Sequence, residues 1–208
     1  MPIFPSKWNA ATAKKQNVAR KSWAASFPVE IESASHSTVF FARSIYVTFT
    51  HILASRRLMP QTLFKERIID GNFRAYVMDK SKILGGRLIQ KFKGVAEAIE
   101  QQYLRELMLI VSPTEDDYTD VIEMYTWRMR YDTDGEPQAE LLSSDGTVMA
   151  TLRSRGIQYL KKQTVKLLRT IRTICVDKLS PLPPGSSPAI RITYTDRLSG
   201  TGISPFPR

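Results

Sequence analysis

The stretch Leu152–Val176, LRSRGIQYLKKQTVKLLRTIRTICV, sets the architecture that we expect for this chain. Mostly apolar residues recur in it at intervals of three and four, which places them on one helix face: Ile157, Leu160, Thr164, Leu167, Leu168, Ile171, Ile174 and Cys175. Lys162, Lys166 and Arg169 fall on the opposite side. At ~1.5 Å per residue such a helix is about 37 Å long. The pattern therefore predicts one long helix that packs through one side and ends before the prolines that follow.

Two earlier segments predict further helices. Residues 37–56 carry apolar side chains on nearly all sides, which is typical of a buried helix at the centre of a fold. Residues 82–103 carry a single apolar stripe, and Gly85-Gly86 within them lacks the spacing of a phosphate-binding loop.

The remaining patterned segments predict strands. Residues 63–69 and 73–78 flank the turn residues Asp70-Gly71-Asn72 and predict a hairpin. A continuous apolar run at 104–111, an alternating run at 120–131 and a last run at 189–195 predict three more strands, whereas the acidic stretch 136–149 is expected to be loop. We therefore expect an α+β domain, with three long helices packed on a mainly antiparallel sheet.

The charge of the chain is strongly basic but uneven. The formal net charge is +10. Residues 150–178 hold eight basic and one acidic side chain, whereas residues 101–149 hold three basic and eleven acidic ones. The uniformly basic coat of a dedicated nucleic-acid binder is therefore missing. The single cysteine, Cys175, excludes an internal disulfide and indicates a reducing compartment, and no apolar run approaches the ~20 residues of a membrane span.

The two ends of the chain are expected to lie outside the folded domain. Residues 1–29 contain no acidic side chain. We favour a flexible basic arm over residues 1–34, and an organelle transit peptide is the alternative. The domain is expected over residues 35–197, followed by a short irregular tail over residues 198–208.

Residues suited to catalysis are scarce, so we expect no enzyme, no cofactor and no metal. The only histidines, His36 and His51, fall in or beside the first helix and are read as cap neighbours or surface residues. Glu115, Asp116 and Asp117 follow a proline and are expected to point into water. Cys175 lies on the apolar helix face and is read as an inert core thiol.

Two kinds of binding stay open on these residues. A ridge on the long helix could neutralise phosphates, through Arg155, Lys162, Lys166 and Arg169. A plain solvated face explains the same ridge, because no aromatic side chains interleave with it for base stacking. The other kind is peptide binding, because an extended peptide can add to an unpaired edge strand, with 119–131 and 189–195 as candidates.

The order of these motifs resembles the HORMA domain family in its meiotic chromosome-axis branch, over about residues 35–197. Four segments carry the resemblance: Gln102-Tyr-Leu-Arg-Glu-Leu-Met-Leu-Ile-Val, Tyr125-Thr-Trp-Arg-Met-Arg-Tyr131, Pro181-Leu-Pro-Pro184 and Ile192-Thr-Tyr-Thr-Asp196. The resemblance implies a non-enzymatic adaptor in the nucleus, on the chromosome, without a membrane. It would act in recombination, homologue pairing and synapsis, with closure-motif peptides of other axis proteins as partners and with homo- or hetero-assembly.

The resemblance also implies the site residues. A closure peptide would add beside the strand 189–195, at Ile190, Arg191, Ile192, Thr193 and Tyr194. A C-terminal safety belt would wrap the peptide and dock on the strand at about Thr119–Tyr131, through Tyr125, Trp127, Met129 and Tyr131.

The segment after the last strand departs from the family pattern. Only Leu198–Arg208 follow it, without a Pro-x-x-Tyr-x-Pro continuation, so the safety belt is expected to be incomplete. A truncated or spliced product, or a fragment, would explain this, and so would a domain that keeps the fold without locking a ligand. We expect weak peptide capture by residues 1–208. The alternative function is a basic α+β nucleic-acid-binding protein of mitochondria.

Overall fold

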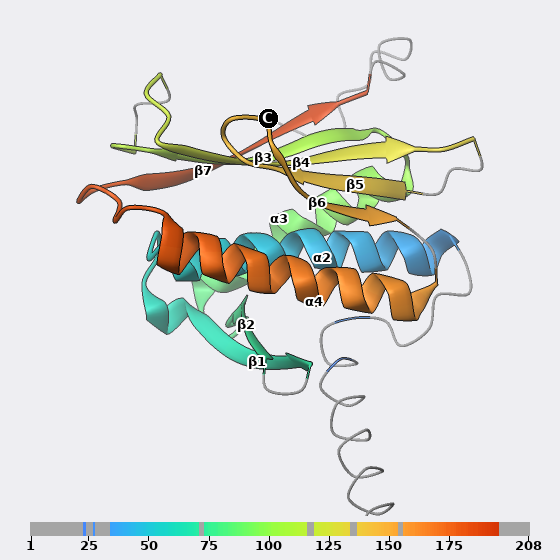
Figure 1. Ribbon diagram of the computed structural model, residues 1–208, viewed down its shortest axis with the longest axis horizontal. Helices are drawn as coiled ribbons and strands as arrows, with labels where there is room; N and C mark the ends of the chain where they lie inside the picture. The colour runs from blue at the N-terminus through green and yellow to red at the C-terminus, as the bar shows by residue number, and fades with distance from the viewer. Residues whose placement is uncertain are drawn as a thin grey trace, which may run out of the picture.

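A sheet, three helices and a hairpin form successive layers of the structure. The computed structural model describes residues 23, 27, 34–70, 73–115, 119–133, 137–153 and 156–195. Three helices lie beneath one face of the sheet: α2 (Ala34–Ser55), α3 (Ile83–Glu100) and α4 (Ile157–Thr173). The hairpin β1 (Phe64–Asp70) and β2 (Phe73–Met78) lies on the other side of the helices (Figure 1). The predicted α+β class, with three long helices and a separate hairpin, is confirmed.

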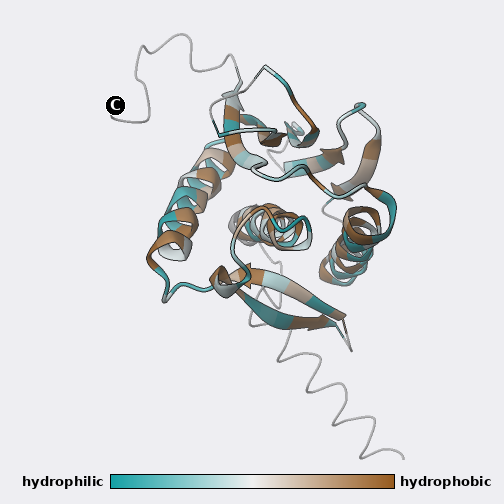
Figure 2. Cartoon of the chain, turned by 90° about the vertical axis from the view of Figure 1, so that its left-hand side faces the viewer, coloured by the Kyte–Doolittle hydropathy of each residue, from teal (hydrophilic) through white to brown (hydrophobic). Residues whose placement is uncertain are grey.

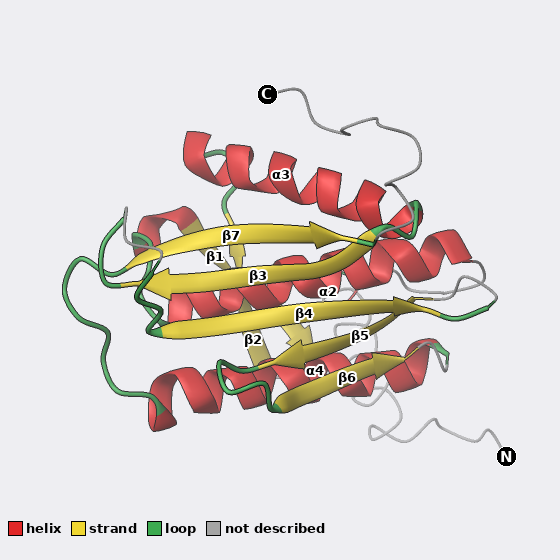
Figure 3. Cartoon of the chain, turned by 90° about the horizontal axis from the view of Figure 1, so that it is seen from above, coloured by secondary structure: helices red, strands yellow, loops and turns green. Residues whose placement is uncertain are grey.

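The main sheet has five antiparallel strands. Seen from above, their order is β6 (Val148–Arg153), β5 (Pro137–Leu142), β4 (Glu123–Tyr131), β3 (Leu104–Ser112) and β7 (Ser187–Tyr194). Figure 3 shows β7 beside α3 at one border of the sheet and β6 above α4 at the other. Among the described residues, β6 and β7 are therefore the two edge strands.

The helix α2 forms the centre of the molecule, as its apolar pattern predicts. Phe40, Phe41, Ile45, Phe49 and Ile52 are all completely buried. Figure 2 shows why both sides are covered: α2 lies between the sheet and the hairpin, with a helix on either flank. Two aromatic residues from the expected arm join this core, because Trp23 and Phe27 are buried and their rings stack at 4.4 Å between centroids. Residues 1–22 and 198–208 lie outside the described residues.

The long helix begins later than predicted. Leu152 and Arg153 belong to β6, and α4 starts at Ile157 after Gly156. Gly156 has φ +85°, a left-handed conformation that glycine adopts at little steric cost. This non-helical residue separates α4 from β6, the strand before it. Downstream, the helix continues as a π-helical turn over Ile174–Lys178. The buried side of α4 is the predicted one, since Leu160, Leu167 and Ile171 lie in the core.

The expectation of a loop over residues 136–149 is wrong. This stretch forms β5 and the start of β6, which pair with each other as a hairpin. Ala139 and Leu141 are buried between the half-buried Gln138 and Glu140, so the strand alternates although acidic and polar residues dominate the segment. Asp145 closes the turn by accepting hydrogen bonds from Ser143 Oγ (2.6 Å) and from the Thr147 N–H (3.0 Å).

Within the described residues, no helix is both long and apolar enough to cross a membrane.

Candidate functional site

The edge strand β7 is the part of the sheet best placed to accept another strand. On one side it pairs with β3, with Ile192 opposite Leu107 and Ile190 opposite Leu109. On its other side no strand of the described chain is paired with it. Backbone donors and acceptors along such an edge form a template for strand addition.

The side chains of β7 alternate between two environments. Ile192 and Tyr194 pack against the core on the helix side of the sheet, and the neighbouring Ile190 is 36% exposed. The Tyr194 ring lies 5.6 Å from the Tyr103 ring, and partial burial raises the pKa of Tyr194. Arg191 and Thr193 alternate with them and belong to the outer face. All five predicted edge residues thus lie together on one accessible strand.

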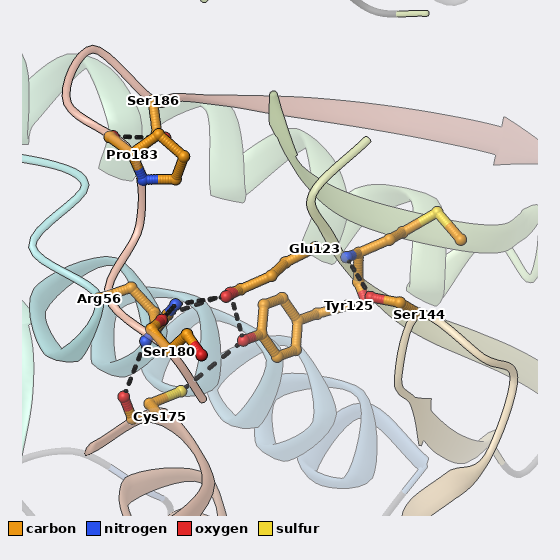
Figure 4. Close-up of polar contacts among 9 residues, drawn as sticks. Arg56, Glu123, Tyr125, Ser144, Cys175, Ser180, Pro183 and Ser186 are labelled. Carbon is orange, nitrogen blue, oxygen red and sulfur yellow. Dashed lines mark hydrogen bonds and ion pairs between the residues drawn. The ribbon is translucent and has the colours of Figure 1, made fainter. Parts of the chain in front are cut away.

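A buried guanidinium holds the loop that leads into β7 (Figure 4). Arg56, at the end of α2, pairs with the Glu123 carboxylate of β4 through Nη2 and through Nε, the latter at 3.1 Å. The same guanidinium donates to the carbonyl oxygens of Cys175 (3.0 Å) and Ser180 (2.7 Å). One side chain therefore joins α2, the sheet, the π-helical turn and the loop before β7.

Both partners of this ion pair are almost fully buried. The Tyr125 hydroxyl donates to Glu123 Oε2 at 2.8 Å and lies 3.8 Å from Cys175 Sγ. Burial, with Cys175 and Glu123 nearby, raises the pKa of Tyr125 well above its usual value. Burial also raises the pKa of the Cys175 thiol to about 11, so the thiol stays protonated at neutral pH. Cys175 is thus a core residue without the thiolate character of a nucleophile.

The loop itself forms one wall of a groove. Ser186 donates to the Pro183 carbonyl through its N–H (3.2 Å) and through its hydroxyl (2.8 Å), and Gly185 has φ +89°. The groove of about 940 Å³ lies between residues 181–186 and the end of α2. Arg56 follows directly after α2 and donates a hydrogen bond to the Ser180 carbonyl at the start of the loop. It therefore fixes the two walls of the groove, and with them the start of β7, relative to each other.

The prediction that residues 119–131 form an edge strand is wrong. The strand β4 pairs with β3 on one side and with β5 on the other. Tyr125, Trp127 and Met129 are core side chains, and the half-buried Tyr131 donates its hydroxyl to the Leu104 carbonyl at 3.1 Å. The hairpin β5–β6, which lies in the stretch expected to be loop, occupies the edge of β4. A belt segment reaching this side of the sheet would meet β6 instead.

The histidine expected at the surface is also buried. His51 is completely inaccessible, and its Nδ1 accepts a hydrogen bond from the Tyr76 N–H at 3.3 Å. Burial, reinforced by the charge of Arg172, lowers its pKa to about 4. No group of three or more metal-ligating side chains occurs in the part of the chain that the structure describes.

Three of the four predicted basic residues lie together on the exposed face of α4, opposite the face that packs in the core. Lys162, Lys166 and Arg169 are exposed and line a second groove, whereas Arg155 lies outside the described residues. This groove and the edge of β7 are separate parts of the surface.

Comparisons with known proteins agree with this fold. The sequence model of the HORMA domain matches residues 37–205. HORMA domain-containing protein 1 of Sus scrofa is 24% identical over 196 residues, which are 94% of this chain and 48% of that protein. This chain thus spans about half the length of the relatives that it matches.

Among solved structures, the C. elegans protein HTP-2 bound to a HIM-3 closure motif superposes with a TM-score of 0.75 at 22% identity, covering 90% of this chain and 82% of that one. C. elegans HTP-1 bound to an HTP-3 motif gives 0.74 at 20% identity, covering 90% and 82%.

Proposed function

Because this chain belongs to the HORMA domain family, we propose that it is a non-enzymatic adaptor of the meiotic chromosome axis that binds closure-motif peptides of other axis proteins. The edge of β7 with which no strand of the described residues pairs carries this proposal. The peptide would add to it as a further antiparallel or parallel strand, with Ile190, Ile192 and Tyr194 facing its helix-side residues. That the related HTP-2 and HTP-1 structures hold closure motifs supports the choice of ligand.

The chemistry of the site supports binding rather than catalysis. Backbone groups of β7 supply hydrogen bonds that do not depend on ligand sequence, and alternate side-chain positions supply selectivity. The buried groups near the site lack the features of catalytic residues: the Cys175 thiol is protonated, and the Glu123 carboxylate forms an ion pair with Arg56. The family match favours this adaptor role over the mitochondrial nucleic-acid-binding alternative.

A charge placed on the β7 edge tests the proposal. Extended peptides of about 12 residues, selected from a random display library on the immobilised chain, would be titrated by fluorescence anisotropy. We expect Ile190→Asp to weaken binding at least about tenfold, because the added carboxylate must lose water beside the incoming strand. The matched control is Val148→Asp, since Val148 is 50% exposed on the opposite edge strand. Equal weakening by both variants would contradict strand addition at β7.

Salt provides a second check on the mode of binding. Strand addition rests on backbone hydrogen bonds and apolar contacts, so the peptide affinity should change little between 50 and 200 mM NaCl. A loss of about 10³-fold over this range would indicate neutralisation of many charges instead.

The proposed location is the chromosome in the nucleus. A fluorescent fusion of the chain in meiotic cells should mark the chromosome axes. A mitochondrial signal would rule out this part of the proposal and support the alternative reading of the N-terminal residues as a transit peptide.

A further inference from the structure

A second groove lies on the side of the molecule away from β7, between α4 and the β1–β2 hairpin. It measures about 680 Å³. Five cationic side chains line it: Lys161, Lys162, Lys166, Arg169 and Lys178. Asp70 is the one carboxylate among its lining residues, and it lies 3.7 Å from Lys161 Nζ. No other carboxylate among the described lining residues neutralises the remaining four cations.

These cations follow one another along a single helix face. Lys162, Lys166 and Arg169 occupy successive turns of α4, so the line of charge from first to last extends about 10 Å. Like charges four residues apart on a helix repel and destabilise it. The negative charges of a bound polyanion would compensate this repulsion between the cations, whereas a plain solvated surface would leave it uncompensated.

Two of the cations are held in place by neighbouring groups. The Arg169 guanidinium lies 5.7 Å from the centre of the Phe73 ring in the hairpin. Lys161 Nζ lies 5.4 Å from the centre of the Trp23 ring. Cation–π contacts of this kind orient a side chain without consuming its hydrogen-bond donors. The groove therefore presents part of its charge in a fixed arrangement before any ligand arrives.

From these features we infer that the α4–hairpin groove binds the phosphate backbone of a nucleic acid without regard to base sequence. Gln158, Thr170 and Thr173 line the groove beside the cations, and amide and hydroxyl groups are common phosphate ligands next to Lys and Arg. None of the described residues that line the groove is aromatic, so they offer no surface for base stacking. Readout of the backbone of a duplex is the binding mode that these side chains fit.

An acidic peptide fits the same surface less well. Among the described lining residues, the apolar side chains are the buried Val165 and the half-buried Ile174. A peptide would therefore find little exposed apolar surface on which to bury its own side chains. A phosphate backbone needs only charge and hydrogen-bond donors, which the groove supplies along its length.

The test compares two variants that carry the same change of net charge. A fluorescein-labelled duplex of random sequence and about 30 base pairs would be titrated with the full chain at several salt concentrations. In Lys162→Gln/Lys166→Gln, the affinity at 0.1 M salt should fall at least about tenfold, and the slope of log K against log salt should shrink by about 1.8. In the control Lys91→Gln/Lys93→Gln, two exposed lysines of α3 are replaced on the other side of the molecule, and both quantities should stay close to wild type.

Three outcomes would overturn the inference. The first is equal loss in the two variants, which would indicate attraction by net charge alone. The second is wild-type protein that leaves the duplex unbound at 50 mM salt. The third is competition in which poly-glutamate displaces the duplex more effectively than unlabelled duplex does, which would assign the groove to an acidic protein segment. The basic residues of positions 1–22 are present in every variant and cancel in the comparison.

Discussion

Arg56 connects more of this molecule than any other side chain that carries a described ion pair. It is almost fully buried, and so is its partner Glu123. Removing one partner of a buried ion pair leaves the other charge without compensation in a medium of low polarity, which is far more costly than losing an exposed pair. The loop before β7 depends on the same guanidinium through the Ser180 carbonyl.

We therefore expect Arg56→Met to lower the free energy of unfolding by about 3–5 kcal/mol. Urea unfolding followed by circular dichroism measures this change. The control is Arg74→Met, because the Arg74–Glu66 pair is exposed and its loss should cost at most about 1 kcal/mol. Adding Glu123→Leu to Arg56→Met should recover part of the loss, since no buried charge then remains. A cost for Arg56→Met no larger than that of the control would show that the pair is not a structural anchor.

His51 makes the stability of the protein depend on pH. Its pKa is about 4 in the folded chain and 6.5 in an unperturbed state, so the unfolded chain binds the proton first. The stabilisation is complete above pH 6.5 and is lost as the pH falls from 6.5 toward 4, with a limit on the order of 3 kcal/mol. Unfolding free energies at pH 7 and pH 5 should therefore differ more in the wild type than in His51→Gln. An equal difference in both proteins would assign the acid sensitivity to other groups.

At the scale of elements, the start of α3 is packed against the chain that precedes it. A Cβ atom at Gly85 would collide with the Asp79 carbonyl oxygen, whereas one at Gly86 would meet only the Lys80 carbonyl oxygen at 3.6 Å. Two adjacent glycines of one helix thus have different reasons to be there. Gly85 permits a close approach of backbones, and Gly86 only lowers the helix propensity.

Alanine at these two positions should have opposite effects. Gly85→Ala should destabilise the fold by about 1–3 kcal/mol, because the Asp79 backbone must shift to make room. Gly86→Ala should be neutral or stabilise it by up to about 1 kcal/mol through better helix propensity. Thermal unfolding of the two variants side by side measures the difference. Equal effects would mean that α3 does not approach Asp79 as closely as described.

At the scale of the whole molecule, the two proposed binding surfaces lie on opposite borders. The β7 edge runs beside α3, and the basic groove lies along α4 at the other border of the sheet (Figure 3). None of the β7 residues is among the described residues that line the basic groove. The core between them is closely packed around α2, so each surface is built without help from the other.

Binding at the two surfaces should therefore be independent. Ile190→Asp should lower peptide affinity without changing duplex affinity, and Lys162→Gln/Lys166→Gln should do the reverse. Peptide titrations with and without saturating duplex should give dissociation constants within about twofold of each other, since coupling requires a state that both ligands bias. A larger shift would place the two ligands on overlapping or mechanically linked surfaces.

Local periodicity in the chain was enough to predict α2, α3, α4, the β1–β2 hairpin and the positions of β3, β4 and β7. The reason is that an amphipathic pattern reports which side of a single element faces the core, and this information lies within a few residues. The same locality explains why Lys162, Lys166 and Arg169 were found on one face of α4. The choice of the β7 residues as a peptide-binding edge came from the family resemblance instead.

Contacts between distant parts of the chain determined the features that local periodicity could not predict. The hairpin β5–β6 covers the edge of β4 through pairing that no local pattern encodes, and this turned an expected edge strand into a central one. Arg56 and Glu123 are 67 residues apart, so their pairing follows only from the packing of α2 under the sheet. His51, Trp23 and Phe27 likewise enter the core because α2 is enclosed on all sides, a burial that depends on every neighbouring element at once.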